Sequence, residues 1–170
     1  MPRQPVKARP QPIGPVAAFG DSLMIGAAPA LRELIPTIDI DAVVSRSALP
    51  VPSILRARAT EGWLPSALVL DLALNGGVSS ELLDDVLTIA AGRRVVMLTA
   101  RCPHCTYTGA ENAIIRAECT KARNCRVADW EALGNANPEW FGTDGVHIGL
   151  GGRGAHAYAQ LVRAQLTRPL

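Results

Sequence analysis

The chain has 170 residues and a mass of 18.0 kDa; 48% of its residues are hydrophobic and 19% are charged, which allows one domain with one sizeable core. The net charge of +2 and the scattered arginines argue against nucleic acid as a partner. No apolar run approaches the roughly 20 residues of a membrane-spanning helix.

Residues 1–15 are rich in proline, lysine and arginine and lack the apolar segment of an export signal. Proline donates no backbone N–H and cannot continue a helix or a sheet ladder, so we expect an extended tail or linker here. The predicted domain covers residues 16–170. The prolines of the tail are Pro2, Pro5, Pro10, Pro12 and Pro15.

Beyond the tail, short apolar runs alternate with segments of helical periodicity. The run at 67–74 is interrupted only by Asp71, as in a strand covered on both faces. Ser79 or Ser80 can cap the helix that follows, and Gly92 lies just past its end. Strands are predicted at 16–19, 38–44, 67–74, 94–99 and 126–129, and helices at 25–34, 53–60, 80–90, 110–121 and 154–166. This alternation indicates a three-layer α/β/α, doubly wound fold with a mostly parallel five-stranded sheet.

Polar residues follow each of the first four predicted strands. Ligands of such sheets bind beyond the carboxyl ends of the strands, so these residues should meet at one edge, together with the loop before the last helix. The residues concerned are Ser22, Ser45, Asn75, Gly76, Arg101, Asp144 and His147.

Two motifs supply the groups of acyl-transfer chemistry. Gly20-Asp21-Ser22 places a serine at the end of an apolar run, and Asp144-Gly145-Val146-His147 adds an imidazole and a carboxylate. A serine hydroxyl becomes nucleophilic when an imidazole takes its proton, and a carboxylate can hold that imidazole in one tautomer. Each motif alone is also a common turn sequence. Their order and shared edge favour a serine hydrolase or transferase.

The motifs resemble those of the SGNH (GDSL) hydrolase superfamily, in particular the SGNH domains attached to membrane acyltransferases that O-acetylate peptidoglycan and other cell-surface glycans. The resemblance runs from residue 16 to about 162. It implies that Ser22 is the nucleophile, His147 the base and Asp144 its orienting carboxylate. It also implies an oxyanion hole formed by the N–H groups of Ser22 and Ser45 and the Asn75 amide, with Ser45 standing where many members have glycine. Ala73 and Leu74 depart from the usual Gly-Thr before that asparagine, which bears on specificity.

The resemblance further implies a flavodoxin-like fold and a serine esterase or O-acyltransferase acting on short acyl esters of a cell-envelope carbohydrate. Hydrolysis and transfer both remain open. The expected partners are an acyl donor ester, a carbohydrate acceptor and a membrane acyltransferase subunit or domain, and no cofactor or metal is expected. Candidate substrate contacts are Asp21, Arg46, Gly76, Arg101 and Trp140.

The four cysteines raise competing interpretations. Cys102-Pro103-His104-Cys105 follows an apolar strand and precedes a helix, which is the layout of a thiol-disulfide oxidoreductase. Cys102 and Cys105 could instead join Cys119 and Cys125 in a zinc site. A separate alternative, which does not depend on the cysteines, is a catalytically silent glycan-binding module. We favour a disulfide between Cys119 and Cys125, with the other two cysteines paired or free. Cysteine content and resemblance point to an extracytoplasmic location; the missing export signal makes the cytoplasm the alternative.

Overall fold

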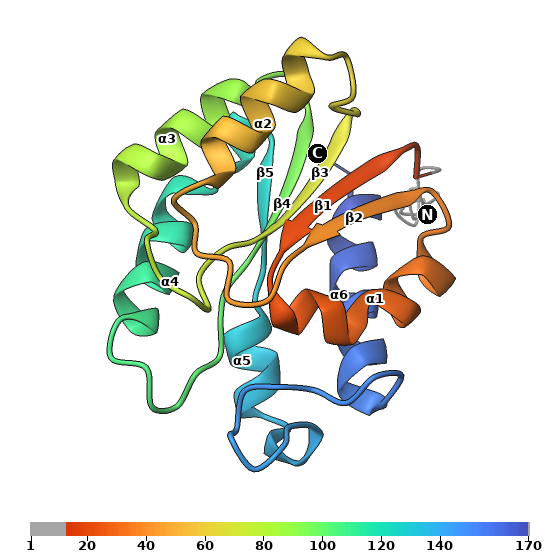
Figure 1. Ribbon diagram of the computed structural model, residues 1–170, viewed down its shortest axis with the longest axis vertical. Coiled ribbons are helices and arrows are strands. Elements are labelled where there is room, and N and C mark those ends of the chain that lie inside the picture. The colour runs from red at the N-terminus through yellow and green to blue at the C-terminus, as the bar shows by residue number, and fades with distance from the viewer. Residues whose placement is uncertain (1–12, 170) are drawn as a thin grey trace, which may run out of the picture.

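The computed structural model describes residues 13–169 and contains a five-stranded sheet in the order β2-β1-β3-β4-β5 (Figure 1). Every neighbouring pair of strands is parallel. The strands are β1 (Val16–Gly20), β2 (Ile38–Ala42), β3 (Ala67–Asp71), β4 (Arg94–Leu98) and β5 (Cys125–Ala128). The predicted doubly wound fold and strand number are confirmed.

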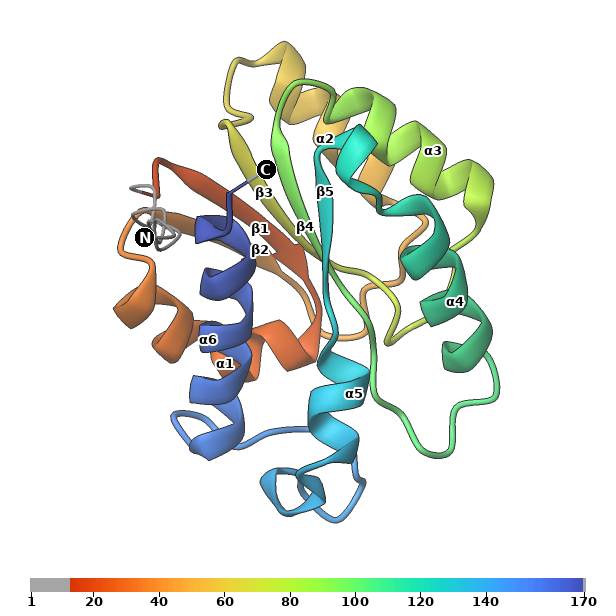
Figure 2. The same cartoon turned by 180° about the vertical axis from the view of Figure 1, so that it is seen from behind.

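Helices cover both faces of the sheet. The two opposite views place α1 and α6 together on one face and α2, α3 and α4 on the other, while α5 continues beyond the end of β5 (Figures 1 and 2). The helices are α1 (Ser22–Leu34), α2 (Val51–Thr60), α3 (Ser80–Ile89), α4 (Thr108–Glu118), α5 (Trp130–Asn135) and α6 (Arg153–Thr167), with short 3₁₀ turns η1 (Lys121–Arg123) and η2 (Pro138–Trp140). No helix within residues 13–169 is long and apolar enough to span a bilayer.

Several boundaries differ from the prediction for local reasons. Helix α1 begins at Ser22 rather than at residue 25 because the Asp21 carboxylate caps it, accepting a hydrogen bond from the Leu23 N–H at 2.9 Å. Strand β3 ends at Asp71 rather than at residue 74, although the three residues after it remain buried. Helix α5 was not predicted; the Asp129 side chain caps it by accepting the Ala132 N–H.

The core is largely apolar, and one of its buried polar contacts lies beneath the site. All five residues of β1 and of β3 are buried. Asp71 in β3 accepts a hydrogen bond from the Tyr158 hydroxyl of α6 at 2.7 Å, and both side chains are completely enclosed. The other carboxyl oxygen of Asp71 has no hydrogen-bond partner among residues 13–169. This contact ties the central strand to the helix layer that contains α1.

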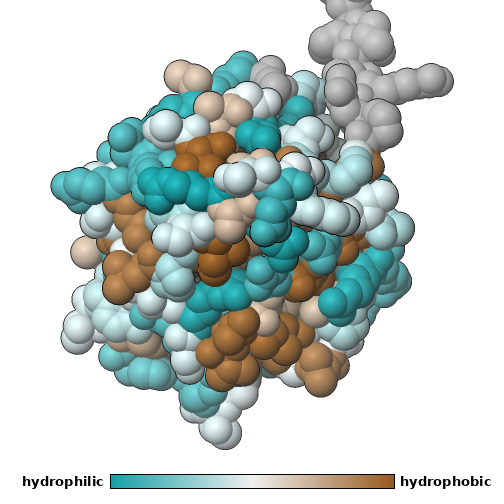
Figure 3. Space-filling model, turned by 45° about the horizontal axis from the view of Figure 1, so that its top comes forward, coloured by the Kyte–Doolittle hydropathy of each residue, from teal (hydrophilic) through white to brown (hydrophobic). Residues whose placement is uncertain are grey.

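The surface mixes hydrophilic and hydrophobic residues, with a hydrophobic patch near the lower edge of the view in Figure 3. Residues 1–12 of the predicted proline-rich tail lie outside the described residues. Ile13 to Pro15 precede β1 and belong to no helix or strand.

Candidate active site

Ser22 lies where β1 turns directly into α1. The turn is tight: a Cβ on Gly20 would come within 2.8 Å of the Met24 side chain, so only glycine fits there. Asp21 follows as the completely buried cap of the helix. Ser22 is then the first residue of α1 and is partly exposed at the carboxyl edge of the sheet.

Asp144 and His147 lie on a second loop at this edge, between η2 and α6. Phe141 pairs with Ile148 in an antiparallel bridge, and the Gly142 N–H donates to the His147 carbonyl at 2.8 Å. At its tip, Gly145 has a φ of +67°, the left-handed region that glycine tolerates. We call residues 141–148 the histidine hairpin. It fixes both side chains on one short, closed segment.

The Asp144 carboxylate is held in place and kept ionised by its neighbours. One oxygen accepts the backbone N–H groups of Val146 and His147 at 2.9 and 3.0 Å, and the other lies 2.7 Å from His147 Nδ1. These contacts, the Val146 N–H foremost, hold the pKa of Asp144 well below its usual range. An ionised Asp144 keeps Nδ1 protonated and leaves Nε2 as the acceptor.

His147 Nε2 lies 2.9 Å from Ser22 Oγ. Serine, imidazole and carboxylate therefore form a continuous relay, although Ser22 and His147 are 125 residues apart in the sequence. In this order the imidazole can take the serine proton while the carboxylate stabilises the imidazolium. The arrangement is that of an activated nucleophile.

The residues predicted to form the oxyanion hole follow three adjacent strands. Ser45 has a φ of +60°, and this left-handed backbone explains how it stands where glycine is usual. Its N–H has no hydrogen-bond partner within residues 13–169. The Val43 N–H donates to the Gly20 carbonyl and the Ala48 N–H to the Gly76 carbonyl, which hold this loop beside those of Ser22 and Asn75.

Asn75 is oriented by Asp21. Its side-chain nitrogen donates to Asp21 Oδ2 at 2.7 Å, and its second N–H is left for another acceptor. Burial raises the pKa of Asp21 to about 6, against the opposing effect of its hydrogen bonds to Leu23 and Asn75. Because Asp21 is completely buried, the prediction that it contacts substrate is wrong. It instead positions Ser22 and Asn75.

Two further predicted substrate contacts are occupied by protein groups. Arg46 donates to the Asp41 side chain and to its carbonyl, each at 2.6 Å, and its side chain is only 10% exposed. Arg101 bonds Asn135 and the Gly145 carbonyl and lies 4.3 Å from the ring centre of Phe141. Both arginines bond loops of the site, so their surroundings do not support the predicted contacts with substrate.

The last two predicted substrate contacts are Gly76 and Trp140, and they lie in different parts of the structure. Gly76 is partly buried with a φ of +77°, beside the ring of Tyr107. Trp140 stacks on the buried Trp130 at 6.2 Å. It lines a separate hollow of about 790 Å³ whose wall includes neither Ser22 nor His147. The predicted contact of Trp140 with substrate at the serine is therefore not supported by its position.

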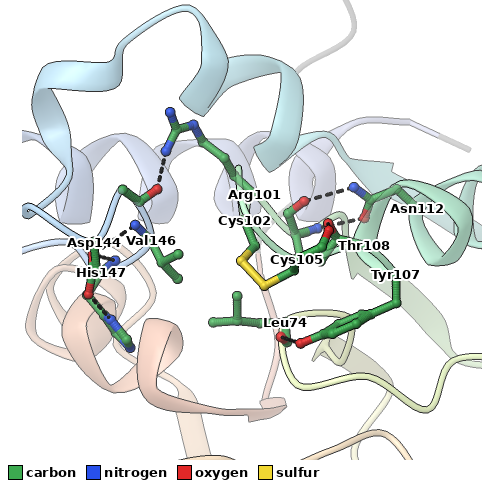
Figure 4. Close-up of a disulfide and its surroundings, with 12 residues drawn as sticks. Leu74, Arg101, Cys102, Cys105, Tyr107, Thr108, Asn112, Asp144, Val146 and His147 are labelled. Carbon is green, nitrogen blue, oxygen red and sulfur yellow. Dashed lines mark hydrogen bonds and ion pairs between the residues drawn. A yellow bond between two sulfur atoms is a disulfide. The ribbon is translucent and has the colours of Figure 1, made fainter.

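All four cysteines are paired within the described residues, Cys102 with Cys105 and Cys119 with Cys125. The sulfurs of Cys102 and Cys105 lie near His104, but cysteine binds zinc as a thiolate and these sulfurs are bonded to each other. The zinc interpretation is therefore not supported. Figure 4 shows this disulfide between the loop of Asp144 and His147 and the side chain of Tyr107, which reaches Leu74.

Sequence reasoning missed the supports behind the site. Tyr107 and Glu111 bond the segment of Asn75, Asn112 bonds Ala100 at the end of β4, and Tyr158 bonds Asp71 in β3. Asn112 and Glu111 are buried polar residues in the first half of α4. No motif marks these four residues. Tyr107, Glu111 and Asn112 bond backbone groups, Tyr158 bonds a side chain, and only the fold brings these partners near.

Comparisons with known proteins agree with this geometry. No family model matches the chain. It is 26% identical over 151 residues to the peptidoglycan O-acetyltransferase OatA of Listeria monocytogenes, covering 89% of this chain and 24% of that protein. It is also 26% identical over 138 residues to the O-acetyltransferase OatA of Staphylococcus aureus, covering 79% and 22%. The chain thus spans about a quarter of the length of these relatives.

Solved structures give the same result for the fold. The C-terminal catalytic domain of Streptococcus pneumoniae peptidoglycan O-acetyltransferase A, solved with a methylsulfonyl adduct, has a TM-score of 0.74 at 24% identity, covering 89% of each chain. A GDSL-like lipase from Bacteroides thetaiotaomicron has a TM-score of 0.68 at 14% identity, covering 89% and 86%. The chain is thus similar in sequence to OatA O-acetyltransferases and shares its fold with the OatA catalytic domain and a GDSL-like lipase.

Proposed function

We propose that residues 16–170 form a catalytic domain that transfers short acyl groups, acetyl above all, through an acyl-enzyme on Ser22. The observation that carries this proposal is the unbroken relay from Ser22 Oγ through His147 to Asp144, with contacts of 2.9 and 2.7 Å. The sequence relationship to O-acetyltransferases supports the acetyl group as cargo.

The reaction begins with attack of Ser22 Oγ on the ester carbonyl while His147 Nε2 takes the hydroxyl proton. Asp144 stabilises the resulting imidazolium through Nδ1. The tetrahedral intermediate then collapses, and the imidazolium returns the proton to the leaving alcohol. Water or a sugar hydroxyl enters next, loses its proton to His147 and takes the acyl group, and the imidazolium returns that proton to Ser22 Oγ as it leaves. Every step is carried by protein groups, so the proposal needs no cofactor or metal.

The developing negative charge needs fixed donors. The N–H groups of Ser22 and Ser45 and the free N–H of Asn75 are the proposed set, and each such donor is typically worth roughly 3–4 kcal/mol to the transition state. Asp21 contributes indirectly, because its hydrogen bond orients the Asn75 amide. Preorganisation of this kind avoids the cost of turning donors toward the charge during the reaction.

The proposed acceptor is a cell-envelope carbohydrate. The relatives are named for O-acetyl transfer, one of them for peptidoglycan, and the matching structure is the C-terminal catalytic domain of a larger protein. We therefore propose a membrane acyltransferase domain or subunit as the partner that supplies acyl groups. The two disulfides fit an oxidising compartment and support an extracytoplasmic location.

The test is hydrolysis of a chromogenic acetyl ester by the purified chain and by Ser22→Ala, repeated with a chito-oligosaccharide as acceptor. Ser80→Ala is the matched control, since Ser80 is likewise the first residue of a helix and is exposed. We expect turnover that disappears in Ser22→Ala and persists in Ser80→Ala, and acetylated sugar in the second run. Turnover that survives loss of the Ser22 hydroxyl would refute the proposed nucleophile.

A further inference from the structure

The loop between β4 and α4 touches both halves of the proposed active site. Arg101, at its start, donates to the carbonyl of Gly145 in the histidine hairpin. Pro103 lies against the same residue, since a Cβ on Gly145 would be 3.5 Å from the proline ring. This side of the loop therefore supports the segment that positions Asp144 and His147.

The other end of the loop supports the segment of Asn75. The Tyr107 hydroxyl donates to the carbonyl of Leu74, the residue before Asn75, at 2.9 Å. Just inside α4, Glu111 accepts the Gly77 N–H at 2.9 Å. These two bonds hold the backbone on either side of Asn75, at Leu74 and at Gly77, so movement of Tyr107 would be passed to Asn75.

The disulfide between Cys102 and Cys105 closes the middle of this loop. Their Cα atoms are 5.3 Å apart, and the Cys105 N–H also donates to the Cys102 carbonyl at 3.2 Å. Asn112 anchors the start of the loop by bonding both the N–H and the carbonyl of Ala100 at 2.8 Å. Figure 4 shows the sulfurs between the two supporting contacts, with the histidine hairpin on one side and Tyr107 on the other.

We propose that this disulfide is a positioning element for acyl transfer, and that its reduction by a dithiol reductant lowers turnover. The inference rests on the proposed function. The balance is an ordinary exchange: the S–S bond takes up two electrons and two protons to give two thiols, and the reductant becomes a disulfide. Cys105 is partly exposed and His104 is exposed, so a small dithiol can reach the bond.

Reduction of the Cys102–Cys105 disulfide changes the relative positions of the catalytic groups and does not alter any reacting group itself. Without the cross-link, residues 102–105 gain backbone freedom, and the contacts of Arg101 and Tyr107 no longer fix the hairpin and the Asn75 segment relative to each other. Displacements of about 1 Å at a reacting centre cost roughly 100-fold in rate. The effect falls on steps that need serine, imidazole and oxyanion donors together, so kcat should fall while KM changes little.

The chain offers a matched control. The disulfide Cys119–Cys125 joins the end of α4 to the start of β5, at the opposite edge of the sheet from Ser22. The experiment compares the Cys102→Ser/Cys105→Ser and Cys119→Ser/Cys125→Ser double variants with the wild type. Each is assayed for acetyl-ester kcat and KM, for the rate at which a sulfonyl fluoride modifies Ser22, and for thermal unfolding. All assays run well below the unfolding transition of each variant.

We expect kcat and the sulfonylation rate to fall about tenfold or more in the first variant and to stay within about twofold in the second. Equal losses in both, or a loss of thermal stability alone, would overturn the inference. Sulfonylation separates the two proposals, because it reports the reactivity of Ser22 even where the chain turns over no acetyl ester.

A second experiment does not depend on whether the Cys102→Ser/Cys105→Ser variant folds. In the Cys119→Ser/Cys125→Ser background, one disulfide remains, and dithiothreitol followed by reoxidation should lower and restore kcat in step with thiol content. Tyr107→Phe keeps the ring and the disulfide but removes the bond to Leu74. It should lower kcat in the same direction by a smaller factor. Full activity in the reduced protein would overturn the inference.

Discussion

The buried carboxyl of Asp21 should make the protein less stable as the pH rises from about 4 to 7. Burial raises its pKa from 3.8 to about 6 in the folded state, so between these values the folded chain holds a proton that the unfolded chain has released. The free energy of unfolding falls wherever the folded state binds more protons. The shift corresponds to about 3 kcal/mol when the titration is complete.

The other carboxyl groups with shifted pKa values do not oppose this loss of stability between about pH 4 and 7. The lowered pKa values of Asp41, Asp129 and Asp144 belong to groups already ionised in both states above about pH 4.5, and their stabilisation is lost only at lower pH. Burial also raises the pKa values of Asp71 and Glu111, so these groups add to the decline. Maximum stability is therefore expected under mildly acidic conditions.

The assay is urea unfolding followed by tryptophan fluorescence, from pH 4.5 to 7.5 at constant ionic strength, on the wild type and Asp21→Asn. The variant does not titrate at this position, so the difference between the two curves should change by about 2 kcal/mol across the range. Only this change with pH is diagnostic, because one amide oxygen cannot accept from both Leu23 and Asn75 and a constant offset is expected. Parallel curves for the two proteins would refute the reasoning.

Three further changes test the site and its support. Asp144→Asn places an amide opposite His147 Nδ1 and should lower kcat by about 10³- to 10⁴-fold at nearly constant KM; an unchanged steady-state kcat would exclude the orienting role. Asn75→Ala should cost about 10²- to 10³-fold in kcat, and a loss seen only in KM would contradict an oxyanion contact. Tyr158→Phe removes the hydrogen bond to buried Asp71 and should lower the free energy of unfolding by about 1–3 kcal/mol at pH 7 with little effect on kcat; equal stability in urea would show that the contact is dispensable.

The sheet and the relay could be predicted from the sequence because each corresponds to a local sequence pattern. Buried parallel strands read as unbroken apolar runs, and the motifs at Ser22 and at Asp144 and His147 place each group at the end of such a run or before the last helix. Boundaries were less accurate because caps and loop burial decide them, as at Asp21 and after Asp71.

The roles of the polar residues around the relay depend on contacts that no sequence pattern contains. Asp21 and Arg101 have the charge of ligand contacts, and only the fold shows that one is enclosed and the other is bonded to Gly145 and Asn135. The disulfide between Cys119 and Cys125 was predicted from the sequence and is present, whereas the sequence left open whether Cys102 and Cys105 pair. Trp140 is close to His147 along the chain, yet its ring turns toward Trp130.

The proposed nucleophile and base meet in space but lie near opposite ends of the domain's sequence, which has a consequence for biosynthesis. Ser22 is made early, whereas its partner follows 125 residues later, about 6–25 s later at ordinary rates of translation. Ile148 of the histidine hairpin lies against Gly154 of α6, and α6 packs along α1. A nascent or truncated chain therefore displays an unactivated serine, and reactivity toward esters begins only when the last helix has docked.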